Sequence, residues 1–503
     1  MSFEYIKKII KKIKDLDYDV NDYKKVVKNP YLPSTAYVNW AVHLAENGNL
    51  SEAEEKLSSS ILMAEQNPEA YLHLGILKIK EKDFESAKKL FKKAIKRDKD
   101  NARAFCFLAN VQAETGEFEE AEKNYDKALK LEQNNSDIFL NWGIAKLREK
   151  KYLEAIEKFK KAYKFNMSNM SSLYFWGIAD TELNEFEDAK EKFKAIIDVE
   201  PHHYEALYYL AYILYKEKKF EESLVYSTKS IEVFDKKIET YMLVGESYMY
   251  LNDEKNSLKY YELGESKACE NYFFVISKGL ALQQFKKFEE SKATFLHAIE
   301  LSPENELGYS SLGVSYFETK DYENADKVFK KSLELNPKNA VALDKVGDIE
   351  ALKENYAVAI DSYKKVLELS AGFTGNYQKI AKAYLKLEDY ENANKYYEKA
   401  LEYFPKDTDI LAEYSGVLIT QKDYRGAIRK LRVALKLEEK NIECLHLLFY
   451  VNYLLAKEES SDYNVKEAMG IAKQIEEINP DLFRYGKEKD ELLSIKQTKN
   501  EIN

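Results

Sequence analysis

Apolar residues along this chain recur at the spacing of one helix face, stop at a short polar break, and then resume at the same spacing. Residues 136 to 169 illustrate the pattern. Phe139 and Trp142 begin one helical stripe, a polar break lies near residues 149 to 151, and Tyr152 and Phe159 belong to a second stripe. We therefore expect two helices joined by a tight turn, which is a helical hairpin.

Two series of small residues repeat with this pattern at a constant spacing of 34 residues, twelve times in succession. The earlier series is Ala41, Gly75, Ala109, Gly143, Gly177, Ala211, Gly245, Gly279, Gly313, Gly347, Ala381 and Ser415. The later series is Ala53, Ala87, Ala121, Ala155, Ala189, Ser223, Ser257, Ser291, Ala325, Ala359, Ala393 and Ala427. A period held over most of the chain indicates one supersecondary structure stacked on itself in a linear array.

The small residues are expected where the two helices of a hairpin cross, because a short side chain lets the helices approach closely. An aromatic residue precedes the later small residue by three positions in most repeats, and Leu50 and Glu254 are the two exceptions. Proline follows that small residue by twelve positions in four repeats, where it is expected to end the second helix. These prolines are Pro201, Pro303, Pro337 and Pro405.

This combination of period, small residues, aromatic residues and proline resembles the tetratricopeptide repeat over residues 34 to 441. The resemblance implies an all-α fold, a right-handed superhelical solenoid of stacked antiparallel helix pairs, with about 12–13 repeats and degenerate capping units. Ser223, Ser257 and Ser291 replace alanine in the middle of the array, and Glu254 replaces an aromatic residue. We expect looser packing there, with the register kept.

The repeat pattern divides the chain into four expected segments. Residues 1–33 are expected to form degenerate N-terminal capping helices, and residues 34–441 to form twelve tandem repeats. Residues 442–482 fit a thirteenth repeat with an insertion near residues 458 to 464, and residues 483–503 a C-terminal capping helix and tail. The N-terminal stripe of lysine opposite isoleucine also suits a helix lying on an anionic membrane, which is the alternative to a cap.

Composition limits the partners and the cellular compartment that are expected for this protein. The 503 residues carry a net charge of −10 with lysine and glutamate interspersed, so a nucleic acid is not an expected partner. Cys106, Cys269 and Cys444 are isolated, which supports neither disulfides nor zinc and favours a reducing compartment. The first residues contain neither a signal-peptide core nor a stretch long enough to span a membrane. A cytoplasmic protein is therefore expected.

The resemblance also implies a binding surface, because the first helix of each pair lines the concave wall of such arrays. The residues facing that wall are the second, fifth, ninth, twelfth and thirteenth of each repeat. Repeats five to seven place aromatic and methionine side chains there, which are typical of peptide and helix recognition. These candidates are Tyr174, Tyr208, Tyr212, Tyr215, Met242 and Met249. Alternatively, they only pad contacts between adjacent first helices.

Repeats ten and eleven differ, since they present Asp344, Asp348, Gln378 and Lys382 at these positions. The lysine and asparagine pattern of a chaperone-tail clamp is missing, because Asn110 is the one asparagine at a ninth place and its fifth-place partner is Cys106. The asparagine ladder of the sugar-transferase arrays is interrupted as well. Neither of these two binding modes is therefore expected.

No pattern of residues indicates catalysis, a cofactor or a metal. The sequence lacks a glycine-rich phosphate loop, a paired-histidine zinc motif and a nucleophile elbow. His202 and His203 form one local cluster, which fits a solvated loop between repeats better than a metal site. We expect a non-catalytic scaffold or adaptor that binds a peptide, helix or protein surface in the concave groove. The alternative is a recognition subunit whose catalytic partner is another chain, and self-association is a further possibility.

Overall fold

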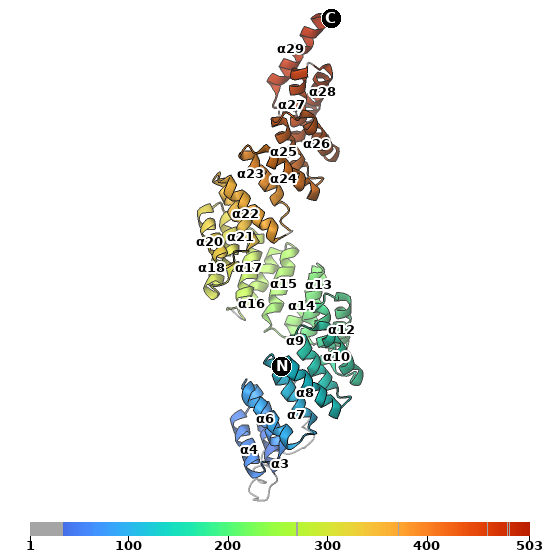
Figure 1. Cartoon of the computed structure of the whole chain (residues 1–503), viewed down its shortest axis with the longest axis vertical. Helices are drawn as coiled ribbons and strands as arrows, with labels where there is room; N and C mark the ends of the chain where they lie inside the picture. Colours follow the sequence, from blue (N-terminus) through green and yellow to red (C-terminus); the bar gives the residue numbers. More distant parts are fainter. Residues whose placement is uncertain are drawn as a thin grey trace. The chain divides into compact units, whose positions relative to one another are not determined.

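The computed structural model describes residues 34–267, 270–370, 372–459, 461–479, 481 and 483–502, with side chains up to residue 494. The capping helices expected in residues 1–33, Cys269 and Pro480 lie outside these residues. The described part of the chain contains 27 helices and no strand (Figure 1). Contacts divide the chain into an N-terminal unit and a C-terminal unit at the boundary between Asp253 and Glu254.

The N-terminal unit consists of consecutive antiparallel helix pairs. Three residues join the two helices of each pair, and each pair packs on the next. The pairs are α3 (Ser34–Glu46) with α4 (Leu50–Met63), α5 (Pro68–Lys80) with α6 (Phe84–Arg97), α7 (Ala102–Glu114) with α8 (Phe118–Leu131), α9 (Ser136–Arg148) with α10 (Tyr152–Phe165), α11 (Met170–Glu182) with α12 (Phe186–Val199), and α13 (Tyr204–Lys216) with α14 (Phe220–Val233), followed by α15 (Ile238–Tyr250).

The C-terminal unit continues the same pattern from α16 (Glu254–Glu265), the helix that begins with glutamate instead of an aromatic residue. Its pairs are α17 (Tyr272–Gln284) with α18 (Phe288–Leu301), α19 (Glu306–Glu318) with α20 (Tyr322–Leu335), α21 (Ala340–Leu352) with α22 (Tyr356–Leu369), α23 (Asn376–Lys386) with α24 (Tyr390–Tyr403), α25 (Thr408–Thr420) with α26 (Tyr424–Leu437), and α27 (Ile442–Glu459) with α28 (Asp462–Ile478), followed by α29 (Gly486–Ile502). The expected all-α solenoid of stacked helix pairs is thus confirmed within each unit.

The small residues lie where an aromatic ring of the second helix packs against the first. A Cβ added to Gly143 would lie 2.5 Å from Cε1 of Phe159, and its three nearest heavy atoms all belong to that ring. The ring is fully buried. The close approach at these glycines is therefore between a backbone and a ring. The same pairing joins Gly75 to Phe91, Gly177 to Phe193, Gly279 to Phe295, Gly313 to Phe329 and Gly347 to Tyr363.

Every turn within a helix pair before α27 ends its first helix in the same way. After α9, the amide of Lys150 donates to the carbonyl of Leu147 at 3.0 Å, and the amide of Lys151 donates to Lys146 at 2.9 Å. This is the Schellman arrangement, which requires a left-handed residue after the helix. Lys150 has a φ of 61°. Residues with positive φ recur at each 34-residue step from Gly48 to Lys422, and only Gly48 and Gly116 among them are glycine.

The first helices of several repeats also begin in the same way, with a side chain that caps the N-terminus. The side chain of Asn135 accepts hydrogen bonds from the amides of Asp137 and Ile138 at 2.9 and 3.3 Å, which caps α9. Asparagine makes such a cap in several other repeats, aspartate replaces it at residue 407 and histidine at residue 203. The asparagine caps are Asn67, Asn101, Asn169, Asn271, Asn305 and Asn339.

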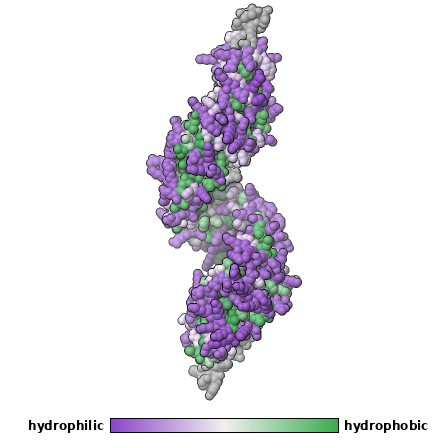
Figure 2. All heavy atoms as spheres, viewed as in Figure 1, coloured by the Kyte–Doolittle hydropathy of each residue, from purple (hydrophilic) through white to green (hydrophobic). Residues whose placement is uncertain are grey.

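The helix ends otherwise follow the sequence closely. Helix α12 ends at Val199, two residues before Pro201. In the last pair, the extra residues expected between the two helices instead lengthen them, since α27 reaches Glu459 and α28 begins at Asp462. The reason is local, because residues 442 to 459 contain neither glycine nor proline to end the helix. The exposed residues in Figure 2 are mostly hydrophilic, with hydrophobic patches between them.

Candidate functional site

The six candidate residues lie on three adjacent first helices of the N-terminal unit. Tyr174 is on α11, the other three tyrosines are on α13, and both methionines are on α15. Helix α13 contacts both α11 and α15. All six side chains are half-buried. We call Tyr174, Tyr208, Tyr212, Tyr215, Met242 and Met249 together the tyrosine surface.

The structure brings some of these residues together and separates others. The rings of Tyr208 and Tyr212 stack with centroids 6.3 Å apart. Tyr209, which is not among the six candidates, connects α13 to α11, because its ring lies 5.8 Å from the ring of Tyr174. Its ring also lies 5.4 Å from that of Tyr208 on the same helix. Tyr215 instead packs at 5.7 Å against Phe220. Part of the tyrosine surface thus also serves as packing between helices.

A lysine covers one ring of this surface. Lys237 lies at the start of α15, at the position where other repeats have a capping asparagine, and its side chain makes no cap. Its Nζ is instead 3.5 Å from the centroid of the Tyr208 ring, within the range of a cation–π contact. Burial lowers the pKa of Lys237. A second lysine, Lys216, lies 5.2 Å from the ring of Tyr212.

The surroundings of the tyrosines are acidic. Burial raises the pKa of Tyr208 above its usual range, and Glu239 and Glu246 add to the effect. Burial likewise raises the pKa of Tyr215, again with Glu246 nearby. These phenols therefore keep their protons at neutral pH and can donate hydrogen bonds. The arrangement is therefore suited to binding.

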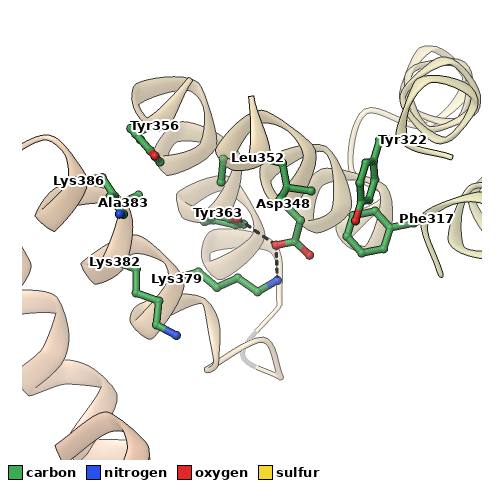
Figure 3. A pocket seen from close by; sticks show the side chains of 11 residues that line it. Phe317, Tyr322, Asp348, Leu352, Tyr356, Tyr363, Lys379, Lys382, Ala383 and Lys386 are labelled. Atoms are coloured by element: carbon green, nitrogen blue, oxygen red, sulfur yellow. Dashed lines mark hydrogen bonds and ion pairs between the residues drawn. The ribbon is translucent and has the colours of Figure 1, made fainter. Parts of the chain in front are cut away.

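A pocket of about 460 Å³ lies in the C-terminal unit, lined by the first helices α19, α21 and α23 and by residues of the second helices α20 and α22 (Figure 3). Asp348 lies within it. The hydroxyl of Tyr363 donates to Asp348 Oδ1 at 3.0 Å, and Lys379 Nζ lies 2.8 Å from the same oxygen. Lys379 Nζ is also 2.7 Å from Asp344 Oδ1. This lysine is therefore held between two carboxylates.

The two sides of the pocket differ in chemistry. On one side, the rings of Phe317 and Tyr322 meet edge to face with centroids 5.4 Å apart. On the other side, α23 contributes Lys382 and Lys386 (Figure 3). Lys382 Nζ is 2.8 Å from Glu413 Oε1. Lys386 is exposed and makes no ion pair with any of the residues that the structure describes.

Part of this pocket is predictable from the sequence. Asp348 and Lys382 were placed on the first-helix wall by their positions in the repeat, and both line the pocket. Phe317 and Lys386 occupy the twelfth and thirteenth positions, so the same rule could have found them. Tyr356 begins a second helix, and no feature of the sequence separates it from the aromatic residues of the core.

Other candidate chemistry is limited in the described part of the chain. No group of three or more His, Cys, Asp or Glu side chains there could hold a metal ion. His203 Nδ1 accepts a hydrogen bond from the amide of Ala206 at 3.2 Å, so this histidine caps α13. Burial raises the pKa of the Cys106 thiol to about 12. None of the described helices has the length and apolar character needed to cross a membrane.

Models of protein families match five stretches of the sequence. Residues 5–158 match the tetratricopeptide repeat protein 21 C-terminal ARM domain, and residues 378–440 match the YpiA-like C-terminal tetratricopeptide repeats. Three further tetratricopeptide repeat models match residues 176–227, 276–305 and 307–339. All five descriptions name the tetratricopeptide repeat. The chain is a tetratricopeptide repeat protein.

Solved structures similar to this tetratricopeptide repeat protein include two whose sequences are distant. The structure described as the APC/C hetero-tetramer Cut9–Hcn1 has a TM-score of 0.40 and 15% identity, covering 83% of this chain and 96% of that one. PilF from Pseudomonas aeruginosa has a TM-score of 0.38 and 21% identity, covering 44% of this chain and 96% of that one. No protein with a curated description matches the sequence. The repeats are, in general terms, those of a protein-interaction scaffold.

Proposed function

We propose that this tetratricopeptide repeat protein is a non-catalytic scaffold or adaptor of the cytoplasm, which binds a peptide, a helix or a protein surface on the tyrosine surface. One observation carries the proposal. Three successive first helices present Tyr174, Tyr208 and Met242 at equivalent positions, 34 residues apart. Aromatic rings and methionine offer a large contact area that adapts to a partner, and both are enriched at protein interfaces.

The charges around the tyrosine surface indicate the chemistry of the partner. Glu182 and Glu239 are exposed and Glu205 is half-buried, and all three lie close to the rings on α11 and α13. The ammonium group of Lys237 lies over the ring of Tyr208 and so already has a contact within the tyrosine surface. The remaining carboxylates would attract lysine or arginine, so the bound segment is expected to combine apolar and basic residues.

Substitution of Tyr208 and Tyr212 by serine tests this proposal. A pull-down from native lysate with mass spectrometry identifies the partner, and the purified partner is then titrated against the wild type, Y208S and Y212S. We expect each variant to lose binding by about tenfold or more, as at other interface aromatics, with an unchanged melting curve. Tyr463→Ser is the matched control, because this tyrosine is 60% exposed on α28 and lies outside the tyrosine surface.

Two outcomes would contradict the proposal. Unchanged binding with a lowered melting temperature would assign both tyrosines to packing between first helices. Unchanged binding and melting would mean that the partner binds elsewhere. Recovery of one enzyme in fixed stoichiometry would instead favour a recognition subunit of an enzyme complex, and light scattering on the purified chain measures self-association.

A further inference from the structure

The first helices of the C-terminal unit carry a row of exposed apolar side chains. Phe273, Leu307 and Val341 are 64%, 39% and 42% exposed, and each is the second residue of its repeat. Leu280 and Leu352 lie on the same helical stripe as Phe273 and Val341, seven and eleven residues further on. Helix α19 packs against both α17 and α21, so the row crosses three neighbouring helices. We call these five residues the apolar row.

The apolar row ends at the pocket described above. Leu352 belongs to both features, and it is 58% exposed beside Tyr356 and Ala351 in the pocket wall. Phe317 and Tyr322 form the facing wall (Figure 3). A volume of about 460 Å³ is within the range of ligand sites and is large enough for one bulky side chain with its neighbours.

Most charges in and around the pocket are already neutralised within the protein. Lys379 is shared by Asp344 and Asp348, and Lys345 Nζ lies 3.3 Å from the other oxygen of Asp348. Lys382 is paired with Glu413. Lys386 is the pocket lysine that makes no ion pair within the part of the chain described, and it leaves the rim with an excess positive charge. This excess favours an anionic group in a ligand.

We propose that the apolar row and this pocket form a second binding site, for a partner peptide that carries a leucine or aromatic side chain next to acidic residues. The bulky side chain fills the pocket between Phe317 and Leu352. A carboxylate of the peptide pairs with Lys386 at the rim, and neighbouring apolar residues of the peptide lie along the apolar row.

The charge distinguishes this site from the tyrosine surface. The tyrosine surface is surrounded by carboxylates and suits a basic segment, whereas the pocket rim suits an acidic one. The two sites lie on different units and share no residue. The second site therefore does not depend on the proposed function of the first, and variants of each can be tested separately on the full chain.

Selection from a random dodecapeptide phage library on the full-length protein tests the proposal. We expect enriched peptides to contain leucine or an aromatic residue flanked by aspartate or glutamate. Fluorescein-labelled copies of these peptides are then titrated by fluorescence anisotropy. Lys386→Glu and Leu352→Ser should each weaken binding about tenfold or more. Replacing the bulky residue of the peptide by alanine should have a similar effect.

The matched controls are Lys395→Glu and Val433→Ser, which alter an exposed lysine on α24 and a 44% exposed valine on α26. Both should leave binding unchanged, and all four variants should melt like the wild type, since each altered side chain is exposed. Enrichment of basic peptides, enrichment of no peptide, or binding that K386E and L352S do not change would overturn the proposal. Binding lost only in Y208S or Y212S would assign the peptides to the tyrosine surface.

Discussion

The ring of Phe159 on α10 occupies the space where Gly143 on α9 would carry a side chain. A Cβ at residue 143 would meet Cε1 and Cδ1 of the ring at 2.5 and 2.7 Å, closer than carbon atoms can approach. Phe159 is fully buried and its ring stacks on Phe175 of the next repeat at 6.1 Å. The ring has little freedom to move away, so the glycine fixes the distance between the two helices.

Gly143→Ala should therefore destabilise the protein by about 1–3 kcal/mol, the usual effect of overpacking a core. Urea unfolding followed by circular dichroism measures the change. In an array of nearest-neighbour contacts, local damage of this kind should also split the unfolding transition. A single transition with the wild-type midpoint would show that the ring can yield, and would contradict the close packing inferred here.

Gly416→Ala provides the control for this substitution, because no heavy atom lies within 4 Å of the Cβ position at Gly416. This helical glycine should be replaced at no cost, or with a gain of up to about 1 kcal/mol from helix propensity. Phe159→Leu should partly rescue G143A. The chain itself pairs Ala41 and Ser415 with Leu57 and Leu431 at the position of the ring, whereas Ala109 and Ala381 occur with Tyr125 and Tyr397.

The turns predict a second effect on stability. Gly116 has a φ of 82° and nothing lies within 4 Å of its Cβ position, so Gly116→Ala tests backbone strain alone. We expect a loss of about 1 kcal/mol, the cost of a left-handed conformation for a residue with a Cβ. Lys150→Gly at the equivalent turn should be neutral or slightly stabilising in the same urea assay. Equal stability of G116A and the wild type would contradict this view of the turn.

The repeated asparagine caps predict a third effect on stability. Asn135→Ala removes the side-chain acceptor for two amides of α9 and should cost about 1 kcal/mol of unfolding free energy. Lys151→Ala is the control, because Lys151 occupies the capping position of α10 without a capping hydrogen bond. Thermal melting by circular dichroism compares the two. A larger loss in K151A than in N135A would contradict the assignment of the cap.

A buried carboxyl group predicts a dependence on pH. Asp180 on α11 is 5% exposed, and its Oδ2 has no hydrogen-bond partner within the described residues. Burial raises the pKa of Asp180 to about 6, although Lys192 opposes the shift. The folded state therefore binds this proton more tightly than the unfolded state. The contribution of Asp180 to stability is greatest below about pH 4 and is lost as the pH rises to about 6.

Asp180→Asn should remove this dependence and raise the unfolding free energy at pH 7 by on the order of 2 kcal/mol. Urea unfolding at pH 4.5 and pH 7 measures the difference between wild type and variant, which should be larger at pH 7. Asp198→Asn, at an exposed carboxylate on α12 that does not contribute to the pKa shift of Asp180, serves as the control. A difference that is larger at pH 4.5 would have the wrong sign for a raised pKa.

The fold could be predicted from the sequence because its signals are local and repeated. The break near residue 150, Pro201 and the small residues at 34-residue steps correctly located the turns and helix ends. The left-handed conformation of Lys150 could not be read in this way, because lysine has no preference for positive φ and the turn imposes it. The lengthening of helices α27 and α28 could not be predicted either, since an insertion can extend a helix as readily as a loop.

The binding surfaces were less accessible to sequence analysis. Position within the repeat identified which helix carries Tyr208 and Asp348. It could not indicate that Lys237, 29 residues beyond Tyr208 in the chain, places its ammonium over that ring. It also could not distinguish Lys382, which is paired with Glu413, from Lys386. Such pairings depend on side-chain rotamers across different repeats, which a repeating pattern does not encode.

The closed hydrogen bonding of each turn has a consequence for how such a chain can change in length. The amides of Lys150 and Lys151 bond within their own hairpin, and Asn135 caps the helix that follows it, so the backbone bonds of one repeat are completed locally. A duplication or deletion of 34 residues in frame would leave no unpaired backbone group at the junction. Evolution can therefore lengthen or shorten the array in whole hairpins, and the number of binding positions can vary without redesign of the core.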